Sequence, residues 1–350
     1  MDSPTDTNEI VDNDEKEYFE HFSFSADPGQ RPERIDRYLA HKIQNVSRSK
    51  IQDAASANCI LVNNKAVKPS YNIKPGDRIS VLMSFPPRST KLVPENIPLN
   101  IIYEDNSLLV IDKEAGMVVH PAFGNYSGTL VNALAYYLKN LPLFSSGDSR
   151  PGLVHRIDKD TSGLIVIAKD EVAKMKLAKQ FFEKTTERKY KALVWGNFSD
   201  DSGTITGNIG RHLKNRKIMD VFPVGEHGKP AVTHYKVIER FGYVTLLECR
   251  LETGRTHQIR AHLKYAGHPL FNDHDYGGDR ILKGTTFSKY RQFVENCFAV
   301  MKRQALHACM LGFEHPLTNE RMFFESDLPE DFATVLEKWR KYSKKESGFC

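Results

Sequence analysis

A charged loop that runs directly into a buried strand constrains this chain more than any other stretch. Residues 150–170 read RPGLVHRIDKDTSGLIVIAKD. Leu164–Ala168 is a short run of apolar residues, mostly branched, opened by Gly163, which predicts a buried strand. The preceding residues 155–162 bring a histidine, an arginine, a lysine and two aspartates to the end of that strand, where loops commonly hold chemistry. The alternative is an ordinary charged turn that bonds its own backbone.

Two further segments favour the chemical interpretation. Residues 251–263 read LETGRTHQIRAHL, and residues 187–196 read ERKYKALVWG. Together with HRIDKDTSG at 155–163, they resemble the motifs of the RluA family of pseudouridine synthases, enzymes that isomerise uridine in RNA. The resemblance extends over residues 101–324. The GKPAVTHY segment at 228–235 brings it nearest to the type D enzymes of the large ribosomal subunit.

The resemblance implies an α+β fold with a mixed or antiparallel sheet, flanking helices and an active-site cleft. It implies that Asp158 is the catalytic carboxylate, that Tyr190 packs on the target base, and that Arg260 pairs with the carboxylate. Taken alone, Tyr190 would be a half-buried strand tyrosine, and Arg260 would be a surface or structural arginine. Whether Asp158 attacks the ribose, attacks the base or abstracts a ribose proton stays open.

Isomerisation of uridine consumes no electrons, phosphate or water, so we expect no nucleotide or redox cofactor. The sequence accordingly shows no P-loop and no GxGxxG fingerprint. His257 and His262 are five residues apart and would not share a helix face, and no recognisable ligand set surrounds them. We therefore expect no metal. A metal-dependent RNA hydrolase is the corresponding alternative.

A base must leave its stack before its glycosidic bond can be reached, at a cost of roughly a few kcal/mol. The resemblance implies that Arg156 fills the resulting gap and that Leu306 lines the pocket, although a strand leucine is also an ordinary core residue. His155 and Arg255 complete the RNA-contacting set predicted for this part of the chain.

Charge is unevenly distributed along the sequence. The first twenty residues hold eight acidic side chains and one basic one, whereas the whole chain is +5. Residues 31–91 contain twelve Lys or Arg against four Asp or Glu. Such a block is either a solvated surface or the electrostatic footprint of a polyanion binder. We expect the acidic tail to be disordered.

The basic block also has a recognisable pattern. Helical spacing over Arg34–Gln44, a helix N-cap at Ser47, and short strands at Cys59–Val62 and Arg78–Met83 resemble the small alpha-L RNA-binding motif. That resemblance implies an RNA-gripping helix face. The contact candidates are Arg34, Arg37, Arg48 and Lys50.

These patterns divide the chain into five parts. We expect an acidic tail at 1–22, an alpha-L RNA-binding domain at 23–85, a Pro-rich linker at 86–100, a catalytic domain at 101–341 and a frayed tail at 342–350.

Within the catalytic domain, residues 170–184 predict a helix whose packing face carries Met175, Ala178 and Phe181 or Phe182. Residues 279–304 predict an extra helix that reaches RNA. Residues 326–341 predict a helix packed through Leu336 and Trp339.

Composition sets the remaining limits. The 350 residues suffice for two domains. No apolar run approaches the roughly 18 residues of a membrane span, and residues 1–20 lack signal-peptide character, so we expect a cytoplasmic protein without membrane contact. Five scattered cysteines without a CxxC motif predict reduced thiols.

The sequence therefore predicts a monomeric RNA pseudouridine synthase that acts on 23S ribosomal RNA. The alternatives are the same chemistry on transfer RNA, and a non-catalytic ribosome-assembly factor that binds RNA.

Overall fold

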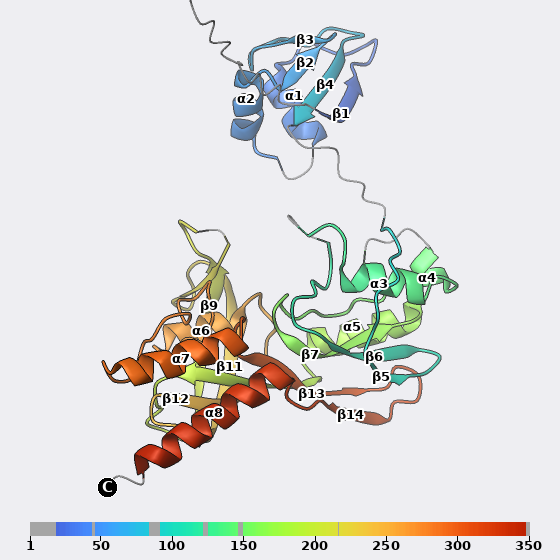
Figure 1. Ribbon diagram of the computed structural model, residues 1–350. Helices are drawn as coiled ribbons and strands as arrows, with labels where there is room; N and C mark the ends of the chain where they lie inside the picture. Colours follow the sequence, from blue (N-terminus) through green and yellow to red (C-terminus); the bar gives the residue numbers. More distant parts are fainter. Residues whose placement is uncertain are drawn as a thin grey trace, which may run out of the picture. The chain divides into compact units, whose positions relative to one another are not determined.

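The computed structural model describes residues 19–43, 46–83, 92–121, 125–145, 150–215 and 217–347. The chain divides into two compact units, Met1–Thr90 and Lys91–Cys350 (Figure 1). The predicted linker at 86–100 lies partly outside the described residues. From 92 to 100 the chain forms neither helix nor strand.

Unit 1 is a small α+β domain. Its four-stranded sheet has the order β1-β4-β2-β3, and two short helices pack on it over an apolar core. Its elements are β1 Phe19–Ser25, α1 Ile35–Lys42, α2 Arg48–Ser56, β2 Ile60–Val62, β3 Lys65–Ala66 and β4 Arg78–Met83. The predicted N-cap is confirmed, because the Ser47 side chain accepts a hydrogen bond from the Lys50 amide.

Strand β1 begins at Phe19, inside the segment predicted as an acidic tail. Phe22 and Phe24 alternate with polar residues, which suits a half-exposed strand, and β1 pairs antiparallel with β4. The charge of the first twenty residues obscured this short alternation. Residues 1–18, which hold most of that charge, lie outside the described part.

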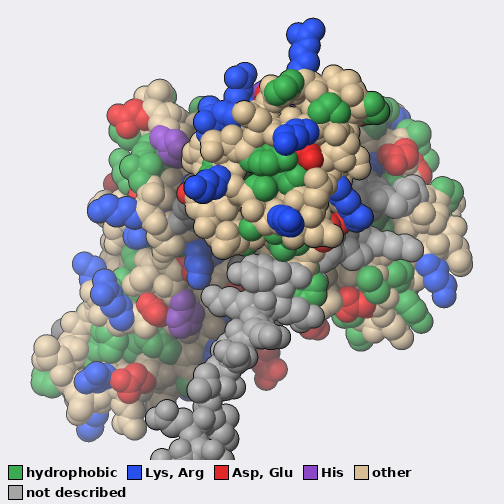
Figure 2. Space-filling view, turned by 90° about the horizontal axis from the view of Figure 1, so that it is seen from above, with side chains coloured by type: hydrophobic (Ala, Val, Ile, Leu, Met, Phe, Trp, Pro, Cys, Tyr) green, Lys and Arg blue, Asp and Glu red, His purple; other side chains and the backbone are tan. Residues whose placement is uncertain are grey.

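A buried carboxylate joins the two helices of unit 1. Asp36, whose side chain is fully buried, accepts hydrogen bonds from Arg34, Arg48 and Gln52. The hydrogen bonds from Arg34 hold the pKa of Asp36 well below its usual range. Because Arg34 and Arg48 remain roughly half exposed, their guanidinium groups are fixed at the surface. On the face of this unit that Figure 2 shows, several Lys and Arg side chains lie at the surface with few carboxylates between them.

Unit 2 holds a ten-stranded sheet with helices on both sides. Its elements are β5 Ile101–Glu104, β6 Leu108–Lys113, α3 Leu130–Tyr137, α4 Pro142–Ser145, β7 Ser162–Ala168, α5 Glu171–Glu183, β8 Glu187–Trp195, β9 Ser202–Arg211, β10 Met219–Phe222, β11 Lys229–Arg240, β12 Val244–Leu251, α6 Gln258–Tyr265, α7 Ser288–Val300, β13 Leu306–Glu314, β14 Arg321–Glu325 and α8 Glu330–Ser347. The hairpin of β9 and β10 had no clear sequence signal.

The strand order is β10-β9-β11-β12-β8-β13-β7-β6-β5, and β14 pairs with β13. Every described pairing is antiparallel except that of β13 with β7. The predicted α+β class with a mixed sheet is confirmed. β13 lies between β8 and β7, so it joins the two halves of the sheet seen in Figure 1.

The joint between β7 and β13 requires a glycine. Gly163 has a φ of +114°, and a Cβ there would lie 2.3 Å from the Ala308 carbonyl oxygen. All seven residues of β7 are buried, as the sequence predicted for Leu164–Ala168. The loop before β7 is therefore anchored to a rigid, buried strand.

Helices α7 and α8 cover one end of the sheet. Tyr290, Val294 and Cys297 of α7 are buried in one apolar cluster with Leu336 and Trp339 of α8. The extra helix predicted within 279–304 is confirmed, and so is packing through Leu336 and Trp339. Contact of this helix with RNA stays a prediction.

The predicted packing face of α5 is wrong except at Phe181, which packs against an apolar cluster with Ala173 and Leu177. Met175 and Phe182 are exposed, whereas Ala173 and Leu177 are buried. Ala173 and Leu177 are four residues apart and so share one face of the helix, and the exposed Met175 and Phe182 lie outside that face. Phe181, which continues this face, is only partly buried because it reaches the cavity described below.

The C-terminal boundary also differs from its prediction. Helix α8 continues to Ser347, six residues beyond the expected domain end at 341. Tyr342 extends the packed face, because its ring stacks on Phe293 with centroids 4.6 Å apart. No helix in the described residues is long and apolar enough to span a membrane.

Candidate active site

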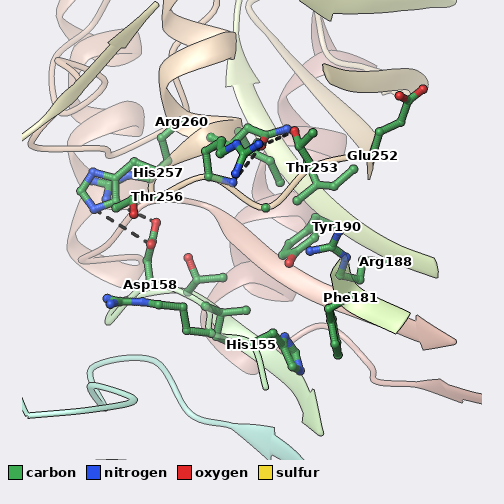
Figure 3. A pocket seen from close by; sticks show the side chains of 18 of the residues that line it. His155, Asp158, Phe181, Arg188, Tyr190, Glu252, Thr253, Thr256, His257 and Arg260 are labelled. Atoms are coloured by element: carbon green, nitrogen blue, oxygen red, sulfur yellow. Dashed lines mark hydrogen bonds and ion pairs between the residues drawn. The ribbon is translucent and has the colours of Figure 1, made fainter. Parts of the chain in front are cut away.

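A cavity of about 560 Å³ opens where the loop before β7 faces strand β8 and the start of α6. The loop contributes Asp158, β8 contributes Tyr190, and α6 contributes Arg260 (Figure 3). These three residues, predicted from separate motifs, are brought together. Leu306, the first residue of β13, also lines the cavity and is buried.

The loop that carries Asp158 is fastened on both sides. Lys113, a fully buried lysine at the end of β6, donates hydrogen bonds to the carbonyls of Glu114, Met117 and Lys159. Burial lowers the pKa of Lys113 to about 7, although three carbonyl acceptors favour the ammonium form. Arg303 donates to the Asp160 carbonyl at 3.1 Å. Asp158 is therefore presented by a fixed backbone.

Arg260 faces three carboxylates. Its Nη1 lies 3.6 Å from Asp158, while its Nε and Nη2 donate a bidentate pair of 2.8 Å hydrogen bonds to Asp273. Nη2 also donates to Asp275 at 2.7 Å. Burial opposes the charge, but the hydrogen bonds to Asp273 hold the pKa of Arg260 above its usual value. The predicted pairing with Asp158 is present, and Asp273 and Asp275 orient the arginine that makes it.

The residue before α6 also turns toward Asp158. His257 has a φ of +53°, which is uncommon for a residue with a side chain and is often found at functional sites. Its Nε2 lies 4.0 Å from Asp158, and its Nδ1 lies 3.0 Å from the Tyr276 hydroxyl. Burial lowers the pKa of His257, against the pull of Asp158. An imidazole and a guanidinium thus flank one carboxylate.

Tyr190 stands on β8 with only 7% of its surface exposed. Burial raises the pKa of its hydroxyl above the usual value, so the phenol is neutral at physiological pH. Its ring offers the cavity a flat apolar surface of the kind on which a nucleobase stacks.

The far end of the cavity holds His155, Phe181 and Arg188 (Figure 3). The His155 ring stacks on Phe181 with centroids 4.4 Å apart, and its Nε2 accepts the Val166 amide hydrogen at 3.0 Å. Burial lowers the pKa of His155 to about 3, so the ring is neutral. His155 thereby ties the loop to β7. RNA contact by His155 stays a prediction.

The other predicted RNA contacts are dispersed. Arg156 is exposed at the cavity, and Arg255 lines it while donating from Nε to the Pro230 carbonyl. The remaining four candidates belong to unit 1, and their RNA contacts stay predictions. They are Arg34 and Arg48 on Asp36, Arg37 at 3.7 Å from Glu33, and the exposed Lys50.

Metal ligation has no support in the described geometry. Within the described ranges no three His, Cys, Asp or Glu side chains gather as a metal site. His262 is buried away from the cavity, with Nδ1 2.9 Å from the Thr233 hydroxyl.

Several residues of the site were not predicted from the sequence. Asp273, Asp275 and Tyr276 lie in FNDHDYGG, where two aspartates beside an aromatic residue were the available signal. Lys113 gave none, because lysine is almost never fully buried. The only sequence signal for Arg188 was its position two residues before Tyr190.

Comparison with known proteins decides the family. Residues 107–265 match the RNA pseudouridylate synthase family, a range that includes Asp158, Tyr190 and Arg260. An uncharacterized RNA pseudouridine synthase of Chlorobaculum parvum is 50% identical over 313 residues, 89% of this chain and 95% of its own. The chain belongs to the RNA pseudouridine synthase family. It is therefore an RNA pseudouridine synthase, an isomerase.

Other relatives agree with this family. The ribosomal large subunit pseudouridine synthase D of Haemophilus influenzae is 39% identical over 315 residues, 90% of this chain and 93% of its own. Residues 33–79 match the S4 domain, so unit 1 carries an RNA-binding module as predicted. The solved structure of human RNA pseudouridylate synthase domain containing 4 shares the fold, with a TM-score of 0.51 and 23% identity over 69% of this chain and 93% of its own.

Proposed function

We propose that this enzyme isomerises specific uridines of 23S ribosomal RNA in the large subunit, with Asp158 as the essential carboxylate. The observation that carries the proposal is the position of Asp158 between Arg260 and His257, in a cavity that also holds the Tyr190 ring. Relatives named as large-subunit synthases D, at 39% to 41% identity over most of the chain, support the ribosomal substrate.

In this mechanism the target uridine leaves its stack and enters the cavity, where its base lies on Tyr190. Arg156, exposed at the cavity, takes the place of the departed base in the RNA. Asp158 then acts on the ribose or the base while Arg260 holds its direction. A group held in the productive geometry needs little reorganisation during the reaction, which is how such a site lowers the barrier.

Unit 1 supplies RNA affinity without chemistry, through its basic segment at residues 31–90. Its S4 match, and the eleven Lys or Arg against four Asp or Glu at residues 31–90, predict contacts to the RNA backbone that position the substrate. The catalytic residues all belong to unit 2. Binding and turnover should therefore respond to different substitutions.

The direct test uses the purified full chain with ribosomal and transfer RNA from cells that lack it. Asp158→Asn should form no pseudouridine and still bind RNA, because it keeps the shape of the side chain but not its charge. Asp160→Asn is the matched control, since it removes a carboxylate from the same loop, and it should retain turnover. If pseudouridine forms on transfer RNA alone, the substrate is transfer RNA and the 23S assignment is wrong. An active Asp158→Asn would reject the mechanism.

A further inference from the structure

Arg188 is a buried cation with no ionic or hydrogen-bonding partner among the described residues. It lies on β8, and only 8% of its surface is exposed. Among the described residues no carboxylate pairs with it and no acceptor receives its hydrogen bonds. Its Nε is shielded from solvent and has no hydrogen-bond partner. A buried charge without an acceptor is costly, so this arrangement suits an acceptor that arrives from outside.

The surroundings of Arg188 hold its head group toward the cavity. Its guanidinium lies 5.5 Å from the centre of the Phe181 ring. On another side it abuts Gly254 of the GRTHQIR segment, where a Cβ would lie 2.9 Å from Nη1. Phe181, Arg188 and Gly254 all line the cavity. A glycine in this place leaves room for the arginine.

Strand geometry puts Arg188 beside Tyr190. Residues two apart on a strand project to the same side, so both side chains enter the cavity, as Figure 3 shows. Lys189 and Lys191 project to the opposite side, where both pair with Glu248 at 3.3 Å. Arg188 is thus the unpaired cation among the three neighbouring basic residues of β8.

The chemistry of an arginine limits what it accepts. Guanidinium donates hydrogen bonds and accepts none, so it suits an oxygen acceptor. Arg188 lies beside Tyr190 on the side away from Asp158 (Figure 3). A base stacked on Tyr190 with its sugar toward Asp158 would therefore bring one edge to Arg188. Uracil presents carbonyl oxygens at C2 and C4, whereas cytosine presents an amino group at C4.

We propose that Arg188 is a catalytic residue that donates hydrogen bonds to a carbonyl oxygen of the flipped uracil. This inference rests on the proposed uridine site. In the isomerisation the N1–C1′ bond breaks and its electron pair passes to the uracil, where the ring shares it with O2 and O4. The C5–C1′ bond then forms, C5 loses its proton and N1 gains one, so no co-reactant is needed. Arg188 stabilises the charge that the base carries between these steps.

The test measures single-turnover rates with enzyme in excess over an RNA fragment that contains a mapped target uridine. Arg188→Gln should lower the rate about 100-fold, the usual effect of losing one donor to a developing oxyanion. The dissociation constant for the RNA should change less than about threefold, because the contact strengthens mainly in the transition state. Arg188→Lys should recover part of the rate. Lys189→Gln, on the opposite side of the strand, should resemble the wild type.

A second arm varies the base and needs no substitution in the protein. Fragments with 2-thiouridine or 4-thiouridine at the target position replace one carbonyl oxygen by sulfur, a weaker acceptor. With one of these fragments the wild type should react more slowly than with the unmodified fragment. Arg188→Gln should react at the same rate with both. This loss of additivity identifies the oxygen that Arg188 contacts.

Other outcomes would overturn the inference. Weaker RNA binding at an unchanged single-turnover rate would make Arg188 a phosphate contact. Equal slowing of wild type and Arg188→Gln by both thio-substituted fragments would place Arg188 away from the base. If the wild type itself forms no pseudouridine on any RNA, the proposed function fails instead, and the two failures are therefore distinct.

Discussion

Asp158 owes its setting to residues far from it in sequence. Arg260 reaches it from α6, and Asp273 and Asp275 hold Arg260 in turn. Asp273 is fully buried and bonds Arg260 in a bidentate geometry, which restricts the guanidinium to one orientation. The direction of the Asp158 carboxylate, the proposed catalytic group, is thus set by a chain of charge-assisted contacts.

A second buried carboxylate, Asp36, stabilises unit 1 in a pH-dependent way. Its pKa lies well below the usual range in the folded state, so its stabilisation is present at neutral pH and is lost as the pH falls through the acidic range. Asp36→Asn should cost about 2 kcal/mol in unit 1 at pH 7, because Arg34 and Arg48 lose a charged acceptor.

Amide hydrogen exchange of α1 and α2 measures this effect. The difference between wild type and Asp36→Asn should narrow below about pH 4, as the stabilisation from the wild-type carboxylate is lost. Asp53→Asn, on the exposed face of α2, is the control and should change protection little. A difference that stays constant from pH 7 to the acid limit of folding would contradict the ionic explanation.

Site residues that stand in recognisable motifs were predictable from the sequence, whereas the residues that hold them in place were not. Asp158, Tyr190 and Arg260 stand in segments with recognisable patterns. Lys113 is a lysine that the pattern would place in solvent, yet the fold buries it among three carbonyls. The burial of Lys113 depends on which backbone carbonyls the folded chain brings around its ammonium group, and sequence spacing does not encode that.

At the scale of elements, the contact of β7 with β13 fixes the loop that carries Asp158. Gly163 is the second residue of β7, and its α-carbon packs against the Ala308 backbone. No side chain fits there without moving one of the two strands. The loop residues 155–161, which include Asp158, would move with β7.

Gly163→Ala should therefore impair both stability and turnover. The added methyl group clashes with backbone atoms, and the positive φ adds strain, for a combined cost of about 3 kcal/mol. Thermal unfolding and single-turnover assays of the full chain measure the two effects. Gly242→Ala is the control, because its φ is +84° with no atom within 4 Å of the added carbon. It should cost about 1 kcal/mol and leave the rate intact. Equal effects of the two substitutions would refute the close-approach argument.

Element prediction succeeded where periodicity was strong. The strand predicted at Arg78–Met83 matches the observed range of β4. The packing face of α5 was mispredicted because size was taken as the signal, whereas Ala173 and Leu177 make the contact. The strand order, with β13 inserted between β8 and β7, joins segments more than a hundred residues apart and has no local signature.

For the whole molecule, we proposed that unit 1 supplies RNA affinity and unit 2 supplies turnover. This assignment predicts how the affinity for RNA depends on salt. Arg37 and Lys50 are exposed side chains of unit 1 and candidate phosphate contacts. Replacing both by Gln in the full chain should reduce the slope of log affinity against log salt by about 2. The single-turnover rate at saturating RNA should remain unchanged.

A double variant of equal charge change controls for net charge. Lys65→Gln with Lys68→Gln alters the same unit at exposed positions outside α1 and α2. Titrations of RNA binding at several salt concentrations distinguish the two pairs. If both pairs lower the slope equally, the unit acts through its overall charge and the helix face has no special role.

The most direct test of the central claim is pseudouridine mapping of total ribosomal and transfer RNA from cells lacking this chain. The cells are complemented with the wild type, with Asp158→Asn or with Asp160→Asn. We predict that 23S sites are lost without the chain and restored by the wild type and Asp160→Asn, but not by Asp158→Asn. Growth rescued by Asp158→Asn without any change in pseudouridine would contradict the catalytic account and favour a role in ribosome assembly.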